Sequence, residues 1–518
     1  MTDSLCSYYT NSQNITAYMA AKLAVADNDI ILEPSAGEGI FIDKVMETGK
    51  RVQVDALDID SKAAAFLKKK YENNGAVVVR KTDTLFDEQL DIYSSSGHYS
   101  KVIGNPPYGA WQDYEKRKAL KKKYAGQYVK ETYSLFLLRC LSVLKMHGRL
   151  SFIIPDTYLF LNMHARLREV LFRNAKIDEI LIFPSRFFPG VSFGYSNLSI
   201  ITLERCGEKE ALNNAFKIIQ GFKSSSELTL LLQNSNKLPE HLRVFHFKQG
   251  DLLSDKLCRV RLAETKTLTI LSDNAKKLGD AADVVTGFYT GDNLHFIKAA
   301  DKKVKGSKNY EIVDPGQVSH CTSLYGIPDV KEGYVPYIKS ASARRYVRQR
   351  DEWFVRWDKG AIDFYHSNQK SRFQNSAFYF KTGIGIPMVK SSTIRAFLME
   401  GHVFDQSIVG IFPKDRSMLY YLLALMNSDV INTFIHVINP TANNSANYVK
   451  QLPYMEPDKK LLMKINDKVR EVISLERSEA YDKADSLHKE INSIIGQIYE
   501  EGNTPVSLKR GSRSEEIL

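Results

Sequence analysis

The chain has 518 residues, of which 43% are hydrophobic and 25% are charged, a balance that indicates a globular protein and excludes a disordered one. This length exceeds what a single ordinary core accommodates, so two or three domains are expected. The formal net charge of +11 favours a polyanionic partner, although charge alone does not distinguish DNA, RNA and an acidic surface.

Targeting and metal signals are weak. The five cysteines show no metal-ligand spacing, and their odd number fits a reducing compartment. The first residues, MTDSLCSYYT, lack the charged and apolar regions of a secretory signal peptide. No run of about 18 apolar residues occurs, so no membrane span is expected. These features predict a cytoplasmic protein without a metal site or a membrane partner.

Short β-rich runs alternate with helix-like stretches in the first half of the chain. Seven strands are expected, at Ile30–Glu33, Arg51–Leu57, Ala76–Val79, Lys101–Ile103, Arg149–Ile154, Glu179–Phe183 and Leu198–Leu203. Helical stretches separate most of them. This order predicts an α/β fold with a doubly wound, mostly parallel sheet and right-handed crossovers that place helices on both faces.

The alternation fades after about residue 245, where shorter strand-like runs, more aromatic residues and more basic residues follow. The predicted domains are therefore 1–245 and 246–518. Apolar residues at helical spacing within Lys459–Glu500 predict one or two closing helices for the second domain.

The segment IILEPSAGEGIF (residues 30–41) predicts a ligand-binding turn. A strand ends at Glu33, and Gly37 and Gly39 follow before the next helix, where glycines let the backbone approach a ligand closely. The acid at the strand end disfavours a phosphate and suits a cationic or hydroxyl-bearing ligand. An ordinary turn with glycines for packing is the alternative.

Acids recur at the ends of the first three strands. Asp58 follows Glu33 by 25 positions, and Asp83 follows Asp58 by 25 positions. Each step is one strand plus one helix, so the three carboxylates should meet at one edge of the sheet. An acid after the second strand commonly binds a ribose hydroxyl pair, and one after the third strand can accept from an adenine amine. Each acid taken singly is more often a helix cap.

The stretch Asn105-Pro106-Pro107-Tyr108 follows the fourth expected strand and should join the same edge. The two prolines stiffen this loop and aim the Pro106 carbonyl outward, close to the Asn105 side-chain oxygen. Two fixed acceptors can bind both hydrogens of one amino group, while Tyr108 provides a flat face for a planar ring. The arrangement suits an exocyclic amine that attacks a methyl sulfonium, with positioning and electrostatics as the main contributions.

These pieces resemble, in their order along the chain, the motifs of the gamma-class adenine-N6 DNA methyltransferases. SYYTNSQNITAYMA (residues 7–20) resembles the motif before the cofactor loop, although Asn11 stands where the common form has proline. LEPSAGEGIF resembles the cofactor loop, LDID and TDTLF resemble the segments with the ribose and adenine acids, and NPPY resembles the catalytic motif. The resemblance implies a Rossmann-like seven-stranded domain that binds S-adenosyl-L-methionine, and a C-terminal mixed α+β target-recognition domain.

The resemblance also implies roles for individual residues. The implied catalytic residues are Asn105, Pro106 and Tyr108. The implied cofactor-binding residues are Tyr9, Thr10, Glu33, Pro34, Ala36, Gly37, Gly39, Asp58, Ile59, Asp83, Thr84, Asn105 and Pro107. The family also uses an aromatic residue opposite the NPPY tyrosine to cover the target base. Phe188 is the first candidate and Phe193 the second, with a purely structural role as the alternative for each.

Basic residues predict contacts to DNA in both domains. Arginine serves phosphates and guanine edges alike, and a solvated charged surface is the alternative explanation. The candidates are Lys116, Arg117, Lys121 and Lys122 after the NPPY stretch, and Lys339, Arg344, Arg345, Arg348 and Arg350 in the second domain.

The sequence therefore predicts a site-specific adenine-N6 DNA methyltransferase of a bacterial restriction–modification system. Its expected partners are duplex DNA and a cognate restriction endonuclease, and a monomer is expected. The target adenine would have to be flipped out of the duplex. Alternatives are methylation of cytosine N4 or an RNA base, a combined enzyme that also cuts DNA, and a DNA-binding protein with a decayed cofactor fold.

Overall fold

The computed structural model describes residues 12–109, 114–187, 197–233, 238–263, 270–271, 275–389, 393–439 and 443–501. The chain forms two compact units, Met1–Leu262 and Ala263–Leu518. The division falls later than the boundary at 245/246 expected from the sequence. Strand β9 (Arg243–Lys248) spans that position and pairs along its whole length with β8 (Ala215–Gln220) of the first unit.

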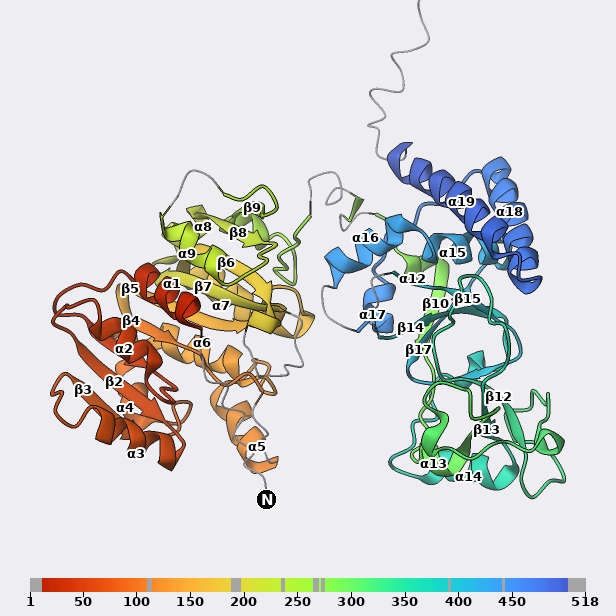
Figure 1. Cartoon of the computed structure of the whole chain (residues 1–518), viewed down its shortest axis with the longest axis horizontal. Coiled ribbons are helices and arrows are strands. Elements are labelled where there is room, and N and C mark those ends of the chain that lie inside the picture. The colour runs from red at the N-terminus through yellow and green to blue at the C-terminus, as the bar shows by residue number, and fades with distance from the viewer. Residues whose placement is uncertain are drawn as a thin grey trace, which may run out of the picture. The chain divides into compact units, whose positions relative to one another are not determined.

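Nine strands form one sheet in unit 1 (Figure 1), in the order β3-β2-β1-β4-β5-β7-β6-β8-β9. The first seven strands are β1 (Ile30–Glu33), β2 (Gln53–Asp58), β3 (Val77–Lys81), β4 (Tyr99–Gly104), β5 (Leu144–Pro155), β6 (Ala175–Pro184) and β7 (Asn197–Arg205). Strands β1 to β5 run parallel to their neighbours in this order, and β7 is antiparallel to both β5 and β6.

The predicted α/β class and the seven expected strands are present, but the expected total of seven is wrong. The two additional strands extend the sheet beyond β6, where β8 is parallel to β6 and β9 is antiparallel to β8. Strand β9 lies at the sheet edge and contains no fully buried side chain.

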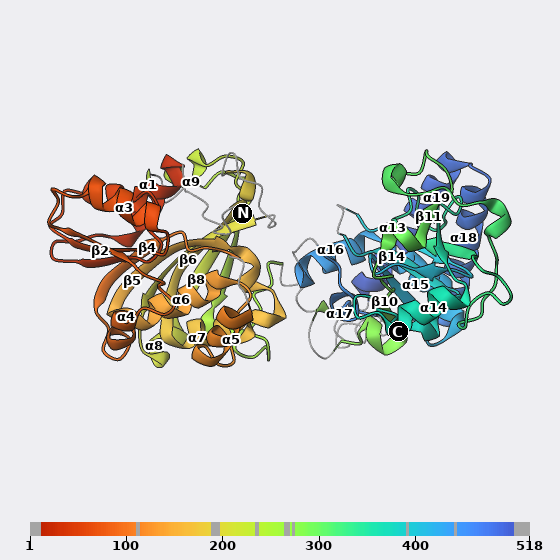
Figure 2. The same cartoon turned by 90° about the horizontal axis from the view of Figure 1, so that it is seen from below.

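Helices cover both faces of the unit 1 sheet. Figure 2 shows α1 (Gln13–Leu23), α3 (Ser61–Lys70) and α9 (Ser226–Gln233) on one face. It shows α4 (Glu88–Tyr93), α6 (Thr132–Val143), α7 (Ala165–Asn174) and α8 (Glu208–Asn213) on the other. The remaining helices of the unit are α2 (Ile40–Met46), α5 (Tyr114–Lys123) and α10 (Gln249–Leu252). Covering both faces explains why β1, β4 and β5 consist largely of buried apolar residues.

The strand order reverses direction between β1 and β4. From β1 the chain proceeds outward to β2 and β3, and then returns to place β4 on the other side of β1. Ligands of open α/β sheets bind beyond the carboxyl ends of the strands at such a reversal. The segments that follow β1 and β4 therefore lie at the position where a cofactor site is expected.

One buried arginine ties the end of unit 1 to its sheet domain. Arg168 on α7 is completely buried, and its guanidinium donates to the carbonyls of Leu257 at 2.6 and 3.1 Å, Tyr158 at 2.6 Å and Leu161 at 2.9 Å. Burial lowers the pKa of Arg168 to about 10, so the group stays charged at neutral pH. These hydrogen bonds hold the chain beyond residue 245 to the first unit.

Unit 2 contains two four-stranded sheets among its described residues. One has the order β10 (Ala282–Thr286), β17 (Ile408–Pro413), β14 (Gly383–Pro387) and β15 (Phe397–Met399), and is antiparallel. The other has the order β11 (Ile297–Ala299), β13 (Trp353–Arg356), β12 (Tyr334–Ile338) and β16 (Val403–Phe404).

The helices of unit 2 complete its core. The short or central ones are α12 (Leu278–Ala281), α13 (Asn293–Phe296), α14 (Lys359–Ser367), α15 (Leu419–Met426), α16 (Asp429–Ile438) and α17 (Ala446–Val449). The region in which closing helices were expected forms two, α18 (Lys459–Arg477) and α19 (Tyr481–Glu501). Within the described segments no single helix is both long and apolar enough to cross a membrane, while α15 and α16 reach that hydropathy together only across a bend of 77°.

Replacing Arg168 with leucine should lower the free energy of unfolding of unit 1 by about 3 kcal/mol, because buried carbonyl groups lose their charged donor. Thermal and denaturant unfolding of the full chain would measure this loss. Arg166→Leu on the same helix is the matched control, since Arg166 is exposed and forms only a surface ion pair with Glu169. Equal stabilities of the two variants would contradict a structural role for Arg168.

Candidate active site

The carboxyl ends of four adjacent strands bring the predicted motifs to one edge of the unit 1 sheet. Glu33 is the last residue of β1, Asp58 is the last residue of β2, and Asn105 directly follows β4. Asp83 lies two residues beyond the end of β3. Because these strands are neighbours in the order β3-β2-β1-β4, the predicted cofactor acids and the NPPY stretch share one edge.

The turn after β1, residues 34–37, is bonded to the end of β2. The backbone N–H of Ala36 donates to the carbonyl of Leu57 at 2.8 Å, and the backbone N–H of Gly37 donates to the Asp58 carboxylate at 2.8 Å. Gly37 has a φ of +53°, which turns its N–H toward the neighbouring strand. The carboxylate predicted to bind a ribose thus also fixes the turn beside it.

The same 34–37 turn is bonded to the loops after β3 and β4. The Thr84 hydroxyl donates to the Pro34 carbonyl, and the Ser35 hydroxyl donates to the backbone carbonyl of Asn105 at 3.2 Å. The turn therefore connects all three neighbouring loops of the edge. The predicted cofactor residues Pro34, Ala36 and Thr84 take part through backbone or hydroxyl groups.

Gly39 occupies a position that excludes any side chain. Its φ is +76°, and a Cβ atom there would lie 2.7 Å from the Tyr71 hydroxyl oxygen and 2.8 Å from Leu67 Cδ2. The Tyr71 hydroxyl lies 3.0 Å from the Gly39 carbonyl oxygen and 2.7 Å from an Asp43 carboxylate oxygen. Tyr71, which follows the last residue of α3, thereby holds the glycine turn against the start of α2.

Glu33 is a buried carboxyl group at the centre of the edge. Its side chain is 1% exposed, and its Oε2 atom has no hydrogen-bond partner among the described residues. Burial raises the pKa of Glu33 well above its ordinary value, and the nearby carboxylates of Asp58 and Asp43 add to the rise, while Lys70 opposes it. The group therefore favours its neutral form until a cationic or donor group faces it.

Asp58 is held by backbone donors and remains partly exposed. Besides the Gly37 N–H, it accepts from the backbone N–H of Asp60 at 2.8 Å. Burial nevertheless raises its pKa above the ordinary value, against the lowering effect of these hydrogen bonds. The adjoining Ile59 is 42% exposed, which leaves an apolar side chain beside the acid.

Asp83 is engaged by a lysine that was expected to contact DNA. Its Oδ1 accepts from the Leu85 N–H at 3.1 Å, and its Oδ2 lies 2.9 Å from the Lys116 Nζ on α5. Lys116 is thus paired at the edge that carries the predicted cofactor acids, and its DNA contact stays a prediction. This ion pair joins the segment after the NPPY loop to the loop after β3.

The NPPY loop is held from behind by α6. The Thr132 hydroxyl donates to the Pro107 carbonyl at 2.5 Å. Pro106 and Tyr108 are buried, and the Tyr108 ring is 1% exposed and packs edge to face on Tyr133. The flat face expected for stacking is thus covered in this structure.

Four predicted residues lie outside the described residues. They are Tyr9 and Thr10 of the motif before the cofactor loop, and Phe188 and Phe193 as candidates for covering the target base. Their predicted roles remain predictions.

The basic residues of α5 divide into two groups. Lys121 and Lys122 are exposed at the end of the helix, as a contact to a polyanion requires. Arg117 is partly buried, and Lys116 pairs with Asp83.

Two residues of unit 2 that were predicted to contact DNA, Arg344 and Arg348, also form contacts within that unit, and their DNA contacts stay predictions. Arg344 binds Glu476 at 2.7 Å and Asp485 at 2.8 Å, which joins it to α18 and α19. The Arg348 guanidinium donates to the Ser340 carbonyl at 2.7 Å and lies over the ring of Phe397. These partners give Arg344 and Arg348 a structural role that the charge pattern did not reveal.

Of the other three predicted contacts of unit 2, Arg350 is exposed, and Lys339 and Arg345 are partly exposed. Arg350 is paired with Asp301 at 2.6 Å. The Lys339 Nζ lies 4.4 Å from the ring centre of Trp353 and 4.6 Å from that of Tyr310.

An acid that the motif search missed follows β5. Asp156 is the first residue after Pro155, on the strand beside β4, and accepts from the Asn197 side chain at 3.2 Å. Burial raises its pKa to about 7. The signal was present in the sequence, because Asp156 directly follows its strand, much as Glu33 and Asp58 stand at the ends of theirs.

Arg139 is a second residue that the motif search missed, and it has no signal in the sequence. It is buried on α6, and its guanidinium donates to the Asp87 carbonyl at 2.6 Å and the Thr84 carbonyl at 3.4 Å. It therefore supports the loop that carries Asp83. The contact between Arg139 and this loop is evident only from the packing of α6.

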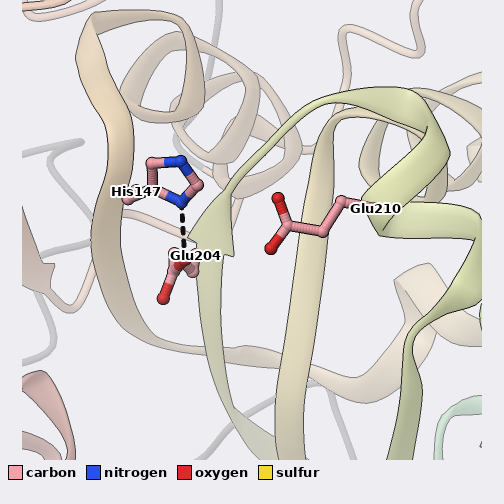
Figure 3. A group of neighbouring side chains, drawn as sticks. All are labelled: His147, Glu204 and Glu210. Carbon is pink, nitrogen blue, oxygen red and sulfur yellow. Dashed lines mark hydrogen bonds and ion pairs between the residues drawn. The ribbon is translucent and has the colours of Figure 1, made fainter.

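His147, Glu204 and Glu210 form a cluster with the composition of a metal site (Figure 3). The Lys176 ammonium, however, lies 3.0 Å from Glu204 and 2.9 Å from Glu210 and offsets part of their charge. The cluster lies near the start of β5 and the end of the antiparallel β7, which is the sheet edge opposite the candidate site. Its contacts are those of a surface ion-pair network.

Comparison with known proteins covers the same motifs. Residues 38–188 match the family model described as Eco57I restriction-modification methylase. The type II methyltransferase M.HincII of Haemophilus influenzae is 30% identical over 198 residues, which are 36% of this chain and 36% of that protein. The type II methyltransferase M.AccI of Acinetobacter calcoaceticus is 22% identical over 54% of this chain and 51% of its own. The chain thus spans about a third to a half of the length of these relatives.

A solved structure shows a similar fold over most of the chain. It is a nuclease-deletion mutant of the Type ISP restriction-modification enzyme LlaGI in complex with a DNA substrate mimic. The TM-score is 0.57 at 13% identity, over 90% of this chain and 47% of that one. The resemblance drawn from the motifs is confirmed: over residues 38–188 this chain is related to the Eco57I restriction-modification methylases.

Proposed function

We propose that this chain is a DNA methyltransferase that transfers a methyl group from S-adenosyl-L-methionine to N6 of an adenine flipped out of duplex DNA. The observation that carries the proposal is the NPPY loop, which is bonded through Ser35 to the turn that also binds Asp58. The NPPY loop, which suits an amino group, and the acids that suit a nucleoside thus lie at one edge of the unit 1 sheet. The matched family and the names of the relatives support the same reaction.

The acids of the edge suit the parts of this cofactor. The unpartnered Oε2 of Glu33 suits a donor or cationic group, Asp58 suits a pair of ribose hydroxyls, and Asp83 suits an adenine amine. The cofactor supplies an electrophilic methyl sulfonium. The strand order of the first seven strands supports a Rossmann-like methyltransferase domain, to which β8 and β9 are additions.

The NPPY loop prepares the target amine. The Asn105 side-chain oxygen and the Pro106 carbonyl would accept the two hydrogens of the adenine amino group, which frees the nitrogen lone pair for attack. The new N–C bond would form as the methyl–sulfur bond of the cofactor breaks, and one N6 proton would then pass to water. Stacking on Tyr108 requires its covered ring face to open, and this stacking would offset part of the cost of flipping the base.

Unit 2 would recognise the target sequence, and the exposed Lys121 and Lys122 of α5 would contact phosphates. The DNA substrate mimic named with the LlaGI structure supports DNA as the partner. The protein would act as a monomer in the bacterial cytoplasm, paired with a restriction endonuclease.

The proposed reaction is tested by transfer of a radiolabelled methyl group to unmethylated duplex DNA, with RNA as the control substrate. Wild-type protein should yield N6-methyladenine, and Asn105→Ala should lower the rate by at least about 100-fold because one acceptor of the amine is lost. DNA affinity should change little.

Asn73→Ala, at an exposed asparagine beyond α3, is the matched control and should keep full activity. Label in N4-methylcytosine would change the base and keep the mechanism. Label in RNA alone, or an active Asn105→Ala variant, would overturn the assignment.

Asp58→Ala should weaken cofactor binding by at least about 10-fold, because a charge-assisted hydrogen-bond acceptor is removed. Isothermal titration with S-adenosyl-L-methionine measures this affinity. Asp60→Ala is the control: it removes the N-terminal cap of α3 and leaves the carboxylate at the end of β2 in place. If both variants bind equally well, Asp58 has no role in the site.

Glu33→Gln should raise the melting temperature of the ligand-free protein and weaken cofactor binding. The folded state raises the pKa of Glu33, so its ionisation destabilises the ligand-free fold as pH rises above the pKa of the unfolded chain. The stabilising effect of Glu33→Gln should therefore be larger in mildly alkaline than in mildly acidic buffer. Thermal unfolding at both pH values tests this, and a destabilised variant would show that the carboxylate has a partner in the folded state.

A further inference from the structure

The start of α6 contacts two consecutive residues of the NPPY loop. The Thr132 hydroxyl donates to the Pro107 carbonyl at 2.5 Å. The ring of the next residue, Tyr133, packs on the Tyr108 ring with centroids 6.5 Å apart and an interplanar angle of 89°. One contact fixes the peptide plane that leads into Tyr108, and the other fixes the direction of its ring.

Tyr133 is itself held by a buried polar network. Its hydroxyl oxygen lies 2.8 Å from Thr157 Oγ1 and 3.1 Å from His164 Nε2, and His164 Nε2 lies 2.8 Å from Glu131 Oε2. Thr157 and His164 belong to the segment after β5, in the 3-10 turns Asp156–Leu159 and Asn162–His164. The network therefore joins the loop after β4 to the segment after the neighbouring strand.

Apolar side chains would be sufficient to pack α6. Tyr133 is completely buried, and His164 and Thr157 are 1% and 6% exposed. Burying polar groups costs free energy unless their hydrogen bonds are made in one geometry, so such a network stabilises one arrangement of its members over others. Here the selected arrangement is that of the Tyr133 ring, on which the orientation of Tyr108 depends.

Resting on the proposed function, we propose that Thr132 and Tyr133 are positioning residues of the methyl-transfer step. They hold the Pro107 peptide and the Tyr108 ring so that the acceptors of the loop and the base-stacking ring keep one relative geometry. Neither residue reaches the reacting atoms itself. Their loss should therefore lower the rate of transfer and leave binding of cofactor and DNA intact.

The test compares full-length Tyr133→Phe, Thr132→Val and Thr132→Ser in steady-state methylation of duplex DNA. Tyr133→Phe keeps the ring and removes the link to the network, and Thr132→Val removes the bond to Pro107. For these two variants kcat should fall about 10- to 100-fold with KM nearly unchanged, because a small displacement of positioned groups is costly. Thr132→Ser keeps the hydroxyl and should recover most of kcat.

Tyr99→Phe is the matched control for loss of a buried tyrosine hydroxyl. Tyr99 is completely buried at the start of β4, at the opposite sheet edge, and its hydroxyl donates to Asp55 at 2.6 Å. It should lose stability without losing kcat. Unchanged kcat in Tyr133→Phe and Thr132→Val, or a Thr132→Ser variant no better than Thr132→Val, would overturn the positioning role.

Amide hydrogen exchange separates failure of this inference from failure of the proposed function. If wild-type protein transfers no methyl group, the proposed function fails, but the loop can still be examined. The Asn105, Tyr108 and Gly109 amides should exchange faster in Thr132→Val than in wild type and Tyr99→Phe. Equal exchange in the three proteins would overturn the inference independently of the reaction.

Discussion

The candidate site depends on one constraint, the hydrogen bonding of the 34–37 turn to the three loops beside it. At the reversal of strand order, the turn after β1 stands between the loops after β2 and β4. The Gly37 N–H of the turn donates to the Asp58 carboxylate, and the Ser35 hydroxyl donates to the Asn105 carbonyl. The Pro34 carbonyl accepts from the Thr84 hydroxyl. A turn without a large side chain is needed here, because each neighbouring loop approaches its backbone.

The second constraint is electrostatic. Glu33, Asp58 and Asp43 converge behind the turn, and burial together with mutual repulsion raises the pKa of Glu33. Only part of this charge is balanced within the fold, by Lys70, which pairs with Asp43 at 2.6 Å. The buried Glu33 carboxyl lowers the stability of the ligand-free protein, and a cationic ligand would remove that cost by facing it. Stability of the free protein and affinity for the ligand are therefore opposed at Glu33.

Helix α6 contacts both the NPPY loop and the loop that carries Asp83. At its start it holds the NPPY loop through Thr132 and Tyr133, and further along Arg139 binds the carbonyl groups of the loop that carries Asp83. A shift of this one helix would therefore displace both halves of the site together. The lysine of α5 that pairs with Asp83 adds a second link between the same two loops.

The amino-acid sequence determined the elements whose signals are local. Acids at strand ends, glycines before a helix and a proline pair after a strand drew attention to Glu33, Gly39, Asp58, Asp83 and Asn105. Short β-rich runs between helical stretches predicted seven of the nine strands of the sheet. Local signals do not report what a charged side chain touches. Tertiary structure alone decided that Lys116 pairs with Asp83, and that Arg344 binds Glu476, 132 positions away. It likewise decided that Tyr133 and Arg139 support the site, because a role that consists of contacts between distant segments leaves no pattern along the chain.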